Sequence, residues 1–378
     1  MCTLVGPVKT AIVGTNLASM SFLNFVAPSR LGKTMLVSPD SRGWLSSFPR
    51  HFPVGQSIGT LSRYGSDLWD PKRKMSVEEL RREWVSDAIK AVMKFPDDAL
   101  DFIESEVMAV KKTSSKNVVL DFANGYSLPT ERAILCTGLG PERDLTSAGV
   151  IFLNYPSGAR VTLDEATTAL MAASKPSTYR GKSALMYGGG ATSAWSTELA
   201  IANGVKDLRW LSADPNGDGF NTANPAGRND EVMRLTKGLR RQGKLKTVQY
   251  MGDASSGSGL EAVINLYGKG KSDNWEADLI IAALGSNPSA PTGILSMLGP
   301  ILYQDLQPLH RSGGFFARDS DASLIVTSPP LSFDQRYAQD FERVLANLPE
   351  EARVRGGILE ARLSAGAMAD FIASEEEL

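Results

Sequence analysis

The stretch Tyr187-Gly-Gly-Gly-Ala-Thr-Ser-Ala-Trp195 decides the fold of this 378-residue chain. It follows an apolar run, Lys182-Ser-Ala-Leu-Met186, and it opens a segment with helical character over residues 191–203. A weaker copy, Val13-Gly-Thr-Asn-Leu-Ala-Ser19, stands near the start of the chain and again follows an apolar run. A strand, a glycine turn and a helix in this order are typical of a nucleotide-binding unit. The two copies therefore predict two nucleotide-binding halves.

The glycine turn has a physical purpose in such units. The start of a helix offers unpaired main-chain N–H groups, and the helix dipole favours negative charge there. The first glycine makes the tight turn, the second lets the main chain approach a pyrophosphate, and the third lets helix and strand pack closely. In the second copy these three positions are Gly188, Gly190 and Ser193, and in the first copy they are Gly14, Asn16 and Ser19.

The first half of the chain predicts a βαβ unit followed by a β meander. Apolar runs and turn signals predict strands at 9–13 and 34–38, a helix at 17–27, a capped helix at 77–95 and three β segments within 105–135. Asn124-Gly125 predicts a tight turn inside the meander. Residues 40–75 lack periodicity, and we expect them to form a long functional loop.

The second half predicts the same order of elements. Strands are expected at 182–186, 207–212, 277–285 and 323–327, with a β meander over 245–270. Helices are expected at 163–174, 191–203, 230–242, 334–347 and 356–373. Each half thus runs from strand to glycine turn, helix, strand and meander, and then to a strand that ends in Gly138 or Gly285.

Composition excludes several classes of protein. The formal net charge is −2, with 42% hydrophobic and 22% charged residues, so we expect neither a nucleic-acid nor a membrane partner. No apolar run approaches the ~20 residues that span a bilayer. The first residues show no targeting signal, which predicts a cytoplasmic protein.

The cysteine and histidine content excludes further classes. Cys2 and Cys136 form no Cys-x-x-Cys pair, and no Cys/His cluster surrounds the two histidines, so no dithiol centre and no metal site are expected. Cys136 ends a predicted buried strand and is interpreted as a core residue.

Four stretches together resemble the two-dinucleotide-binding-domain flavoproteins, a superfamily that includes pyridine-nucleotide reductases and NAD(P)H-dependent flavin monooxygenases. They are Ala11-Ile-Val-Gly-Thr-Asn-Leu-Ala-Ser19, Ala133-Ile-Leu-Cys-Thr-Gly138, Leu185-Met-Tyr-Gly-Gly-Gly-Ala-Thr-Ser193 and Asp278-Leu-Ile-Ile-Ala-Ala-Leu-Gly285. The resemblance implies an α/β fold with two Rossmann-like domains, the second inserted in the first, each with an antiparallel β meander. The implied domains are 1–145 with 292–378, and 146–291.

The resemblance also implies cofactors and an activity. The first domain would bind FAD and the second NAD(P)H; hydride would pass to the flavin, which would then reduce a small organic substrate or mono-oxygenate it with O₂. The implied cofactor-binding residues are Gly14, Asn16, Ala18, Ser19, Asp40, Thr137, Gly138, Gly188, Gly190, Ser193, Gly285 and Ser328. Asp214 favours NADH, whereas Arg209 and Arg228 leave NADPH open. His51, in the expected loop over residues 40–75, is the candidate catalytic residue.

Three departures from the family pattern lie in the first domain. Asn16 replaces the second glycine, Asp40 is displaced from the usual acidic position after Ser38, and Ser328 is the nearest polar residue where relatives carry Gly-Asp. They motivate an alternative: a degenerate relative without normal redox turnover. Such a protein would bind one nucleotide, act as a non-redox cyclase or isomerase, or serve as a scaffold subunit of a partner enzyme. The sequence also leaves open whether the protein forms a homo-oligomer.

Overall fold

The computed structural model describes residues 8–39, 86, 88–113, 117–138, 160–161, 180–187, 200, 204–212, 241–242, 246–249, 279–282, 293–331, 334–347 and 358–375. The chain divides into two compact units. Unit 1 comprises Met1–Pro49, Gly55–Pro141 and Ser286–Leu378, and unit 2 comprises Arg50–Val54 and Glu142–Gly285. Among the described residues, no helix is long and apolar enough to span a membrane.

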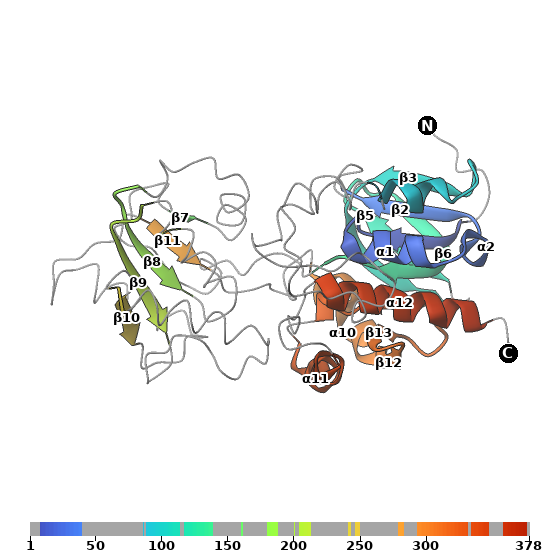
Figure 1. The fold of residues 1–378 in the computed structure, drawn as a ribbon. Helices are drawn as coiled ribbons and strands as arrows, with labels where there is room; N and C mark the ends of the chain where they lie inside the picture. Colours follow the sequence, from blue (N-terminus) through green and yellow to red (C-terminus); the bar gives the residue numbers. More distant parts are fainter. Residues whose placement is uncertain are drawn as a thin grey trace. The chain divides into compact units, whose positions relative to one another are not determined.

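Unit 1 is built on a nine-stranded mixed sheet (Figure 1). Its strands are β1 (Val8–Val13), β2 (Thr34–Ser38), β3 (Leu100–Glu104), β4 (Val107–Lys112), β5 (Val118–Phe122), β6 (Ser127–Leu135), β12 (Gln307–Arg311), β13 (Gly314–Arg318) and β14 (Leu324–Thr327). The order is β12-β13-β14-β6-β1-β2-β3, and β4 pairs with β5, which pairs with β6. Strands β3, β2, β1, β6 and β14 are mutually parallel.

The predicted βαβ unit is confirmed. Strands β1 and β2 pair in parallel with Ala11 beside Met35, and both strands are largely buried, as expected for a strand covered on both faces. The meander is also confirmed: Gly125 adopts φ +82° in the turn between β5 and β6. Strand β6 runs from Ser127 to Leu135, and its polar first half pairs with β5 in the meander.

The helices of unit 1 are α1 (Leu17–Phe25), α2 (Pro28–Leu31), α10 (Ile294–Asp305), α11 (Ala338–Ala346) and α12 (Ile358–Ser374), with short 3₁₀ turns at Pro329–Leu331 and Gln335–Tyr337. Helix α12 packs against α1 and β13 (Figure 1). The main chain of β13 at Gly314 lies so close to that of α12 that a Cβ atom at Gly314 would be 2.2 Å from the carbonyl oxygen of Leu363. Of the predicted helix over 77–95, residues 86 and 88–93 are described and helical.

Strands β12 and β13 form a hairpin that the sequence did not indicate. Ser312 and Gly313 connect the strands with φ values of 49° and 81°, the left-handed pair that a type I′ turn requires. His310 therefore lies in strand β12. Its Nε2 is 2.7 Å from Oδ1 of Asp340, and its ring stacks on Phe315 at 5.6 Å between centroids.

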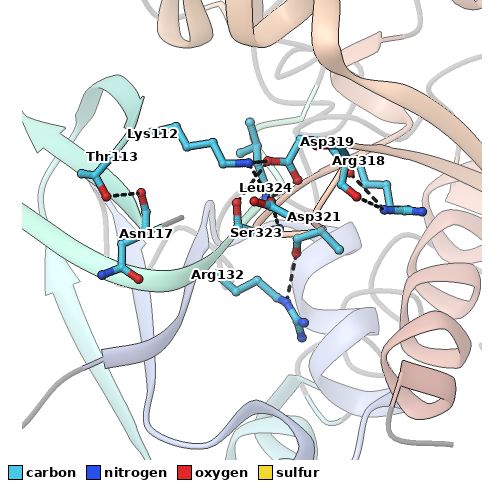
Figure 2. A network of polar contacts seen from close by, with 11 residues as sticks. Lys112, Thr113, Asn117, Arg132, Arg318, Asp319, Asp321, Ser323 and Leu324 are labelled. Carbon is cyan, nitrogen blue, oxygen red and sulfur yellow. Dashed lines mark hydrogen bonds and ion pairs between the residues drawn. The ribbon is translucent and has the colours of Figure 1, made fainter. Parts of the chain in front are cut away.

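A polar network joins the meander to the turn before β14 (Figure 2). The Lys112 ammonium lies 2.5 Å from Asp319 Oδ2 and 2.6 Å from Asp321 Oδ1. Asp319 is only 3% exposed and also accepts hydrogen bonds from the Ser323 hydroxyl and the Leu324 amide. Because a buried carboxylate requires a counter-charge, this network fixes the entry to the last parallel strand.

Unit 2 contains a five-stranded parallel sheet in the order β10-β9-β8-β11-β7. The strands are β7 (Arg160–Val161), β8 (Ser183–Tyr187), β9 (Asp207–Ser212), β10 (Lys246–Gln249) and β11 (Leu279–Ala282). The predicted strands at 182–186 and 207–212 are thereby confirmed. Strand β10, within the predicted meander at 245–270, pairs in parallel with β9, so it extends the central sheet; the rest of that segment lies outside the described residues.

Of the helix predicted at 191–203, Ala200 is described, and it is helical. Val205 donates its amide to the Ala200 carbonyl, and Gly204 adopts φ +82°. This bond pairs the Ala200 carbonyl with the chain that follows Gly204. The helix predicted at 163–174 and the loop at 40–75 lie outside the described residues, as does the helix at 230–242 except for its last two residues.

Candidate nucleotide site of unit 1

The carboxyl ends of the parallel strands bring the described cofactor-binding candidates of the first domain to one edge of the sheet. Gly14 follows β1, Ser38 ends β2, Thr137 and Gly138 follow β6, and Ser328 follows β14. Ligands of open α/β sheets bind at this edge, because loops and helix N-termini converge there. The candidate site is therefore the β1–α1 turn with the loop that follows β6.

Gly14 is required by the close packing of these two loops. It adopts φ +102°, and a Cβ atom there would lie 2.2 Å from the carbonyl oxygen of Cys136. The Gly14 amide also donates to the Val37 carbonyl at 2.7 Å. The first glycine of the pattern is thus explained by the fold alone, whatever ligand the turn receives.

Asn16 is the N-cap of α1. Its Oδ1 accepts hydrogen bonds from the amides of Ala18 at 3.0 Å and Ser19 at 3.3 Å. In return, the Ser19 hydroxyl accepts from the Asn16 amide at 2.9 Å, which completes a capping box. Main-chain N–H groups that a helix start usually offers to an anion are therefore paired within the chain.

The other end of the Asn16 carboxamide is also engaged. Its Nδ2 donates to the Cys136 carbonyl, and a Cβ atom at Gly138 would lie 3.5 Å from the same nitrogen. Asn16 itself has φ −122°, so the turn requires left-handed backbone at Gly14 and not at position 16. The side chain thus bridges the β1–α1 turn and the end of β6.

The end of β2 carries a hydroxyl pair in place of a carboxylate. Thr15 donates its hydroxyl to Ser38 Oγ at 2.9 Å, and both residues are buried. The predicted acidic residue, Asp40, lies just beyond the described residues, which end here at Pro39.

The loop after β6 contains one buried hydroxyl with no partner. Thr137 Oγ1 makes no hydrogen bond in the described part of the chain, although it is shielded from solvent. Leaving such a group unsatisfied costs about 1–3 kcal/mol. Cys136, beside it, is fully buried, and burial raises the pKa of its thiol, against the opposing effect of a hydrogen bond with Thr327. This agrees with the interpretation of Cys136 as a core residue.

Ser328 faces the interior of unit 1. Its hydroxyl donates to Glu360 Oε1 at 2.6 Å, and its amide donates to the Ser364 hydroxyl at 3.0 Å. All three residues are at most 1% exposed. In this structure Ser328 therefore ties the end of β14 to the first turns of α12.

The remaining predicted residues lie outside the described part of the chain. They are Asp40, His51, Gly188, Gly190, Ser193 and Gly285. Strand β8, which leads into Gly188, is described: it lies at the centre of the parallel sheet, between β9 and β11. No cluster of potential metal ligands occurs among the residues that the structure describes.

Sequence reasoning missed the partners of these residues. Asn16 at the start of a predicted helix is itself an N-cap signal, and that signal was available. Its second partner, Cys136, lies 120 positions further along the chain, and local patterns do not indicate such a contact. Glu360 was missed for a similar reason, because nothing in its local sequence distinguishes a buried carboxyl from an exposed one.

The geometry allows a test of whether a dinucleotide fits unit 1. The tight turn at Gly14, the helix that follows it, and the unpartnered Thr137 hydroxyl fit a pyrophosphate at this edge. Among the described residues, the Asn16 side chain competes with such a group, since it holds the amides of Ala18 and Ser19. The residues present therefore fit the group, provided that the Asn16 cap opens.

Comparison with known proteins gives the fold a reference. No model of a protein family matches the chain, and no curated protein matches its sequence. Among solved structures, it is similar to the bacillithiol disulfide reductase of Staphylococcus aureus, with 12% identity, a TM-score of 0.59, and coverage of 98% of this chain and 100% of the other. It is also similar to a flavin-containing monooxygenase from Stenotrophomonas maltophilia, with 12% identity, a TM-score of 0.53, and coverage of 98% of this chain and 99% of the other. For OTEMO in complex with FAD and NADP the identity is 12%, the TM-score is 0.56, and the coverage is 99% of this chain and 86% of the other.

Proposed function

We propose that this chain, which has the fold of the two-dinucleotide-binding-domain flavoproteins, is a flavin-dependent oxidoreductase. The observation that carries the proposal is the buried Thr137 hydroxyl, which has no partner among the described residues and lies in the loop packed against Gly14, before the start of α1. An all-parallel sheet whose central strand, β8, leads into Gly188-Gly-Gly190 supports a second nucleotide site in unit 2.

Each described residue has a defined part in this proposal. Gly14 keeps the β1–α1 turn tight enough for α1 to begin at the sheet edge, and Gly138 leaves room beside it. Thr137 offers a hydroxyl to a ligand at the same edge. A bound flavin would supply two-electron redox chemistry that no side chain provides, and the protein would hold and orient it.

The finer parts of the proposal concern substrate and reductant. A small organic molecule is the proposed substrate, and it is either reduced or mono-oxygenated. NAD(P)H is the proposed reductant, with NADH favoured by Asp214 after β9, because a carboxylate repels the 2′-phosphate of NADPH. Among the neighbours, OTEMO was solved with both FAD and NADP.

The hydrogen bonds of the Asn16 cap favour a second candidate function, that of a relative without FAD. A relative that has lost FAD has no need of free amides at the start of α1, and in this chain two of them are bound by Asn16. Such a protein would bind a single nucleotide in unit 2 or support a partner enzyme.

One experiment separates the two candidates. Purified protein is titrated with FAD at equilibrium, and the mixture is then titrated anaerobically with NADH or NADPH. A flavin oxidoreductase binds FAD, and the flavin absorbance at about 450 nm is lost on addition of the nicotinamide. Protein that binds no FAD at equilibrium, or whose flavin is not reduced, contradicts the proposal and favours the degenerate relative.

A further inference from the structure

The Asn16 side chain and a dinucleotide phosphate would use the same hydrogen-bond donors. The carboxamide accepts from Ala18 N and Ser19 N, which lie in the first turn of α1. A capping side chain and an anion are alternative ways to satisfy those groups. Each N–H donates one strong hydrogen bond, so these two amides do not bind the Asn16 side chain and a phosphate at the same time.

The cap is held from both sides. The Nδ2 of Asn16 donates to the Cys136 carbonyl, so the side chain is fixed to the loop after β6 as well as to α1. Ser19, whose hydroxyl bonds both the amide and the carbonyl of Asn16, is fully buried. A phosphate that reaches the helix therefore displaces several hydrogen bonds, all made by this one residue or to it.

We propose that Asn16 is an internal competitor of the cofactor: its carboxamide closes the phosphate position at the start of α1 and must move away when FAD binds. This inference rests on the proposed function, because it concerns the same site. Its consequence is a flavin that is held weakly and exchanges with the medium, unlike a permanently bound prosthetic group.

The variants Asn16→Gly and Asn16→Asp test the proposal in opposite directions. Glycine frees the two amides and is itself an acceptable N-cap residue, so FAD is expected to bind at least about tenfold more tightly. Aspartate keeps an oxygen for the cap but adds a negative charge, so FAD is expected to bind at least about tenfold more weakly. Affinity is measured by quenching of flavin fluorescence on titration of apoprotein with FAD.

Asn124→Gly is the matched control. Asn124 also accepts a main-chain hydrogen bond through its side chain, from the Tyr126 amide at 3.1 Å, but it lies in the β5–β6 turn. This substitution is expected to leave the affinity for FAD unchanged. Riboflavin, which lacks the pyrophosphate, is the matched ligand and is expected to gain nothing from Asn16→Gly.

Melting temperatures of the apoproteins show whether the variants are folded under the conditions of the binding measurement. Asn16→Gly is expected to melt within about 4 °C of the native chain, since glycine is also an acceptable N-cap residue. Asn16→Asp is expected to melt lower, because one carboxylate oxygen faces the Cys136 carbonyl oxygen in place of the Nδ2 donor. Its affinity for FAD is therefore measured well below its own melting temperature, so that a loss of binding reports on the site and not on unfolding.

The outcomes separate this inference from the proposed function. If the native chain binds FAD and Asn16→Gly binds it no more tightly, the inference is overturned and the proposed function stands. If only Asn16→Gly binds FAD, the inference is supported and the proposed function of the native chain fails. If neither binds FAD, both are overturned.

Discussion

The side-chain amide of Asn16 donates a hydrogen bond to the main-chain carbonyl of Cys136, across 120 positions of sequence. This contact joins the turn after β1 to the loop after the neighbouring parallel strand, β6. The two loops are also held by van der Waals contact, since Gly14 has no room for a side chain against the same carbonyl. The candidate site is thus a tightly packed pair of loops closed by one polar side chain.

Gly14→Ala is expected to destabilise unit 1 strongly. The substitution adds a Cβ atom 2.2 Å from the Cys136 carbonyl oxygen, and φ +102° is unfavourable for any residue with a side chain. We expect a loss of more than about 3 kcal/mol in the free energy of unfolding, measured with denaturant. Gly125→Ala is the control. Gly125 also has a left-handed φ of +82°, but no atom lies within 4 Å of a Cβ added there, so the substitution costs only the backbone strain of about 1–2 kcal/mol. Equal losses at the two positions would contradict the packing of the loops.

Lys112→Met is expected to destabilise the entry to β14. The substitution removes the ammonium that neutralises Asp319, whose side chain is 3% exposed. A loss of about 1–3 kcal/mol in unfolding free energy is predicted, because a nearly buried carboxylate is left with weaker partners. Lys111→Met removes the neighbouring pair with Asp121, whose lysine is 67% exposed, and is expected to cost less than about 1 kcal/mol.

The same network predicts a pH dependence. Burial tends to raise the pKa of Asp321, but hydrogen bonds from Lys112 and Ser323 outweigh it and hold this pKa well below its ordinary value of 3.8. A carboxyl with a lowered pKa in the folded state stabilises the fold above its unfolded pKa, and this contribution is lost as the pH falls through the folded value. The difference in unfolding free energy between the native chain and Lys112→Met should therefore shrink below about pH 4.

At alkaline pH, the difference in unfolding free energy between the native chain and Lys112→Met depends on the titration of Lys112 itself. Burial tends to lower the pKa of Lys112, but hydrogen bonds and charge attraction from Asp319 and Asp321 raise it above 10.5. Its contribution is full below the unfolded pKa and is lost as the pH rises through the folded value. Denaturant titrations from about pH 3 to about pH 11 check both limbs, and a difference that does not change with pH argues against the ion pairs.

Ser328→Ala is expected to destabilise the apoprotein. It removes the hydroxyl that donates to the buried carboxyl group of Glu360, a loss of about 1.5–3 kcal/mol. Ser127→Ala removes a similar bond to Asp121 on the surface and is expected to cost less than about 1 kcal/mol. Thermal unfolding without FAD makes the comparison. If Ser328→Ala melts like the native apoprotein, the hydroxyl does not tie β14 to α12.

Local sequence was sufficient where one segment determines its own structure. The apolar runs at β1, β2, β8 and β9, the Asn124-Gly125 turn and the left-handed backbone at Gly204 follow from periodicity and turn chemistry. Strand β3 was missed because Leu100–Glu104 is short, mixes apolar and acidic residues without strict alternation and is only partly buried. It is a strand because it pairs with β2, which is a long-range effect.

The candidate site divides in the same way. The positions of Gly14 and of the residues after β6 at one edge followed from the parallel order of the strands. The fate of individual side chains did not: Ser328 faces Glu360, and Asn16 reaches Cys136. These contacts depend on helix α12 and strand β6 and require the three-dimensional structure.

A structure of the native chain with FAD bound tests the central claim most directly. The account predicts the pyrophosphate at the start of α1, near Thr137, with the Asn16 carboxamide withdrawn from the amides of Ala18 and Ser19. FAD bound elsewhere, or bound at this edge while the Asn16 cap stays intact, would contradict it.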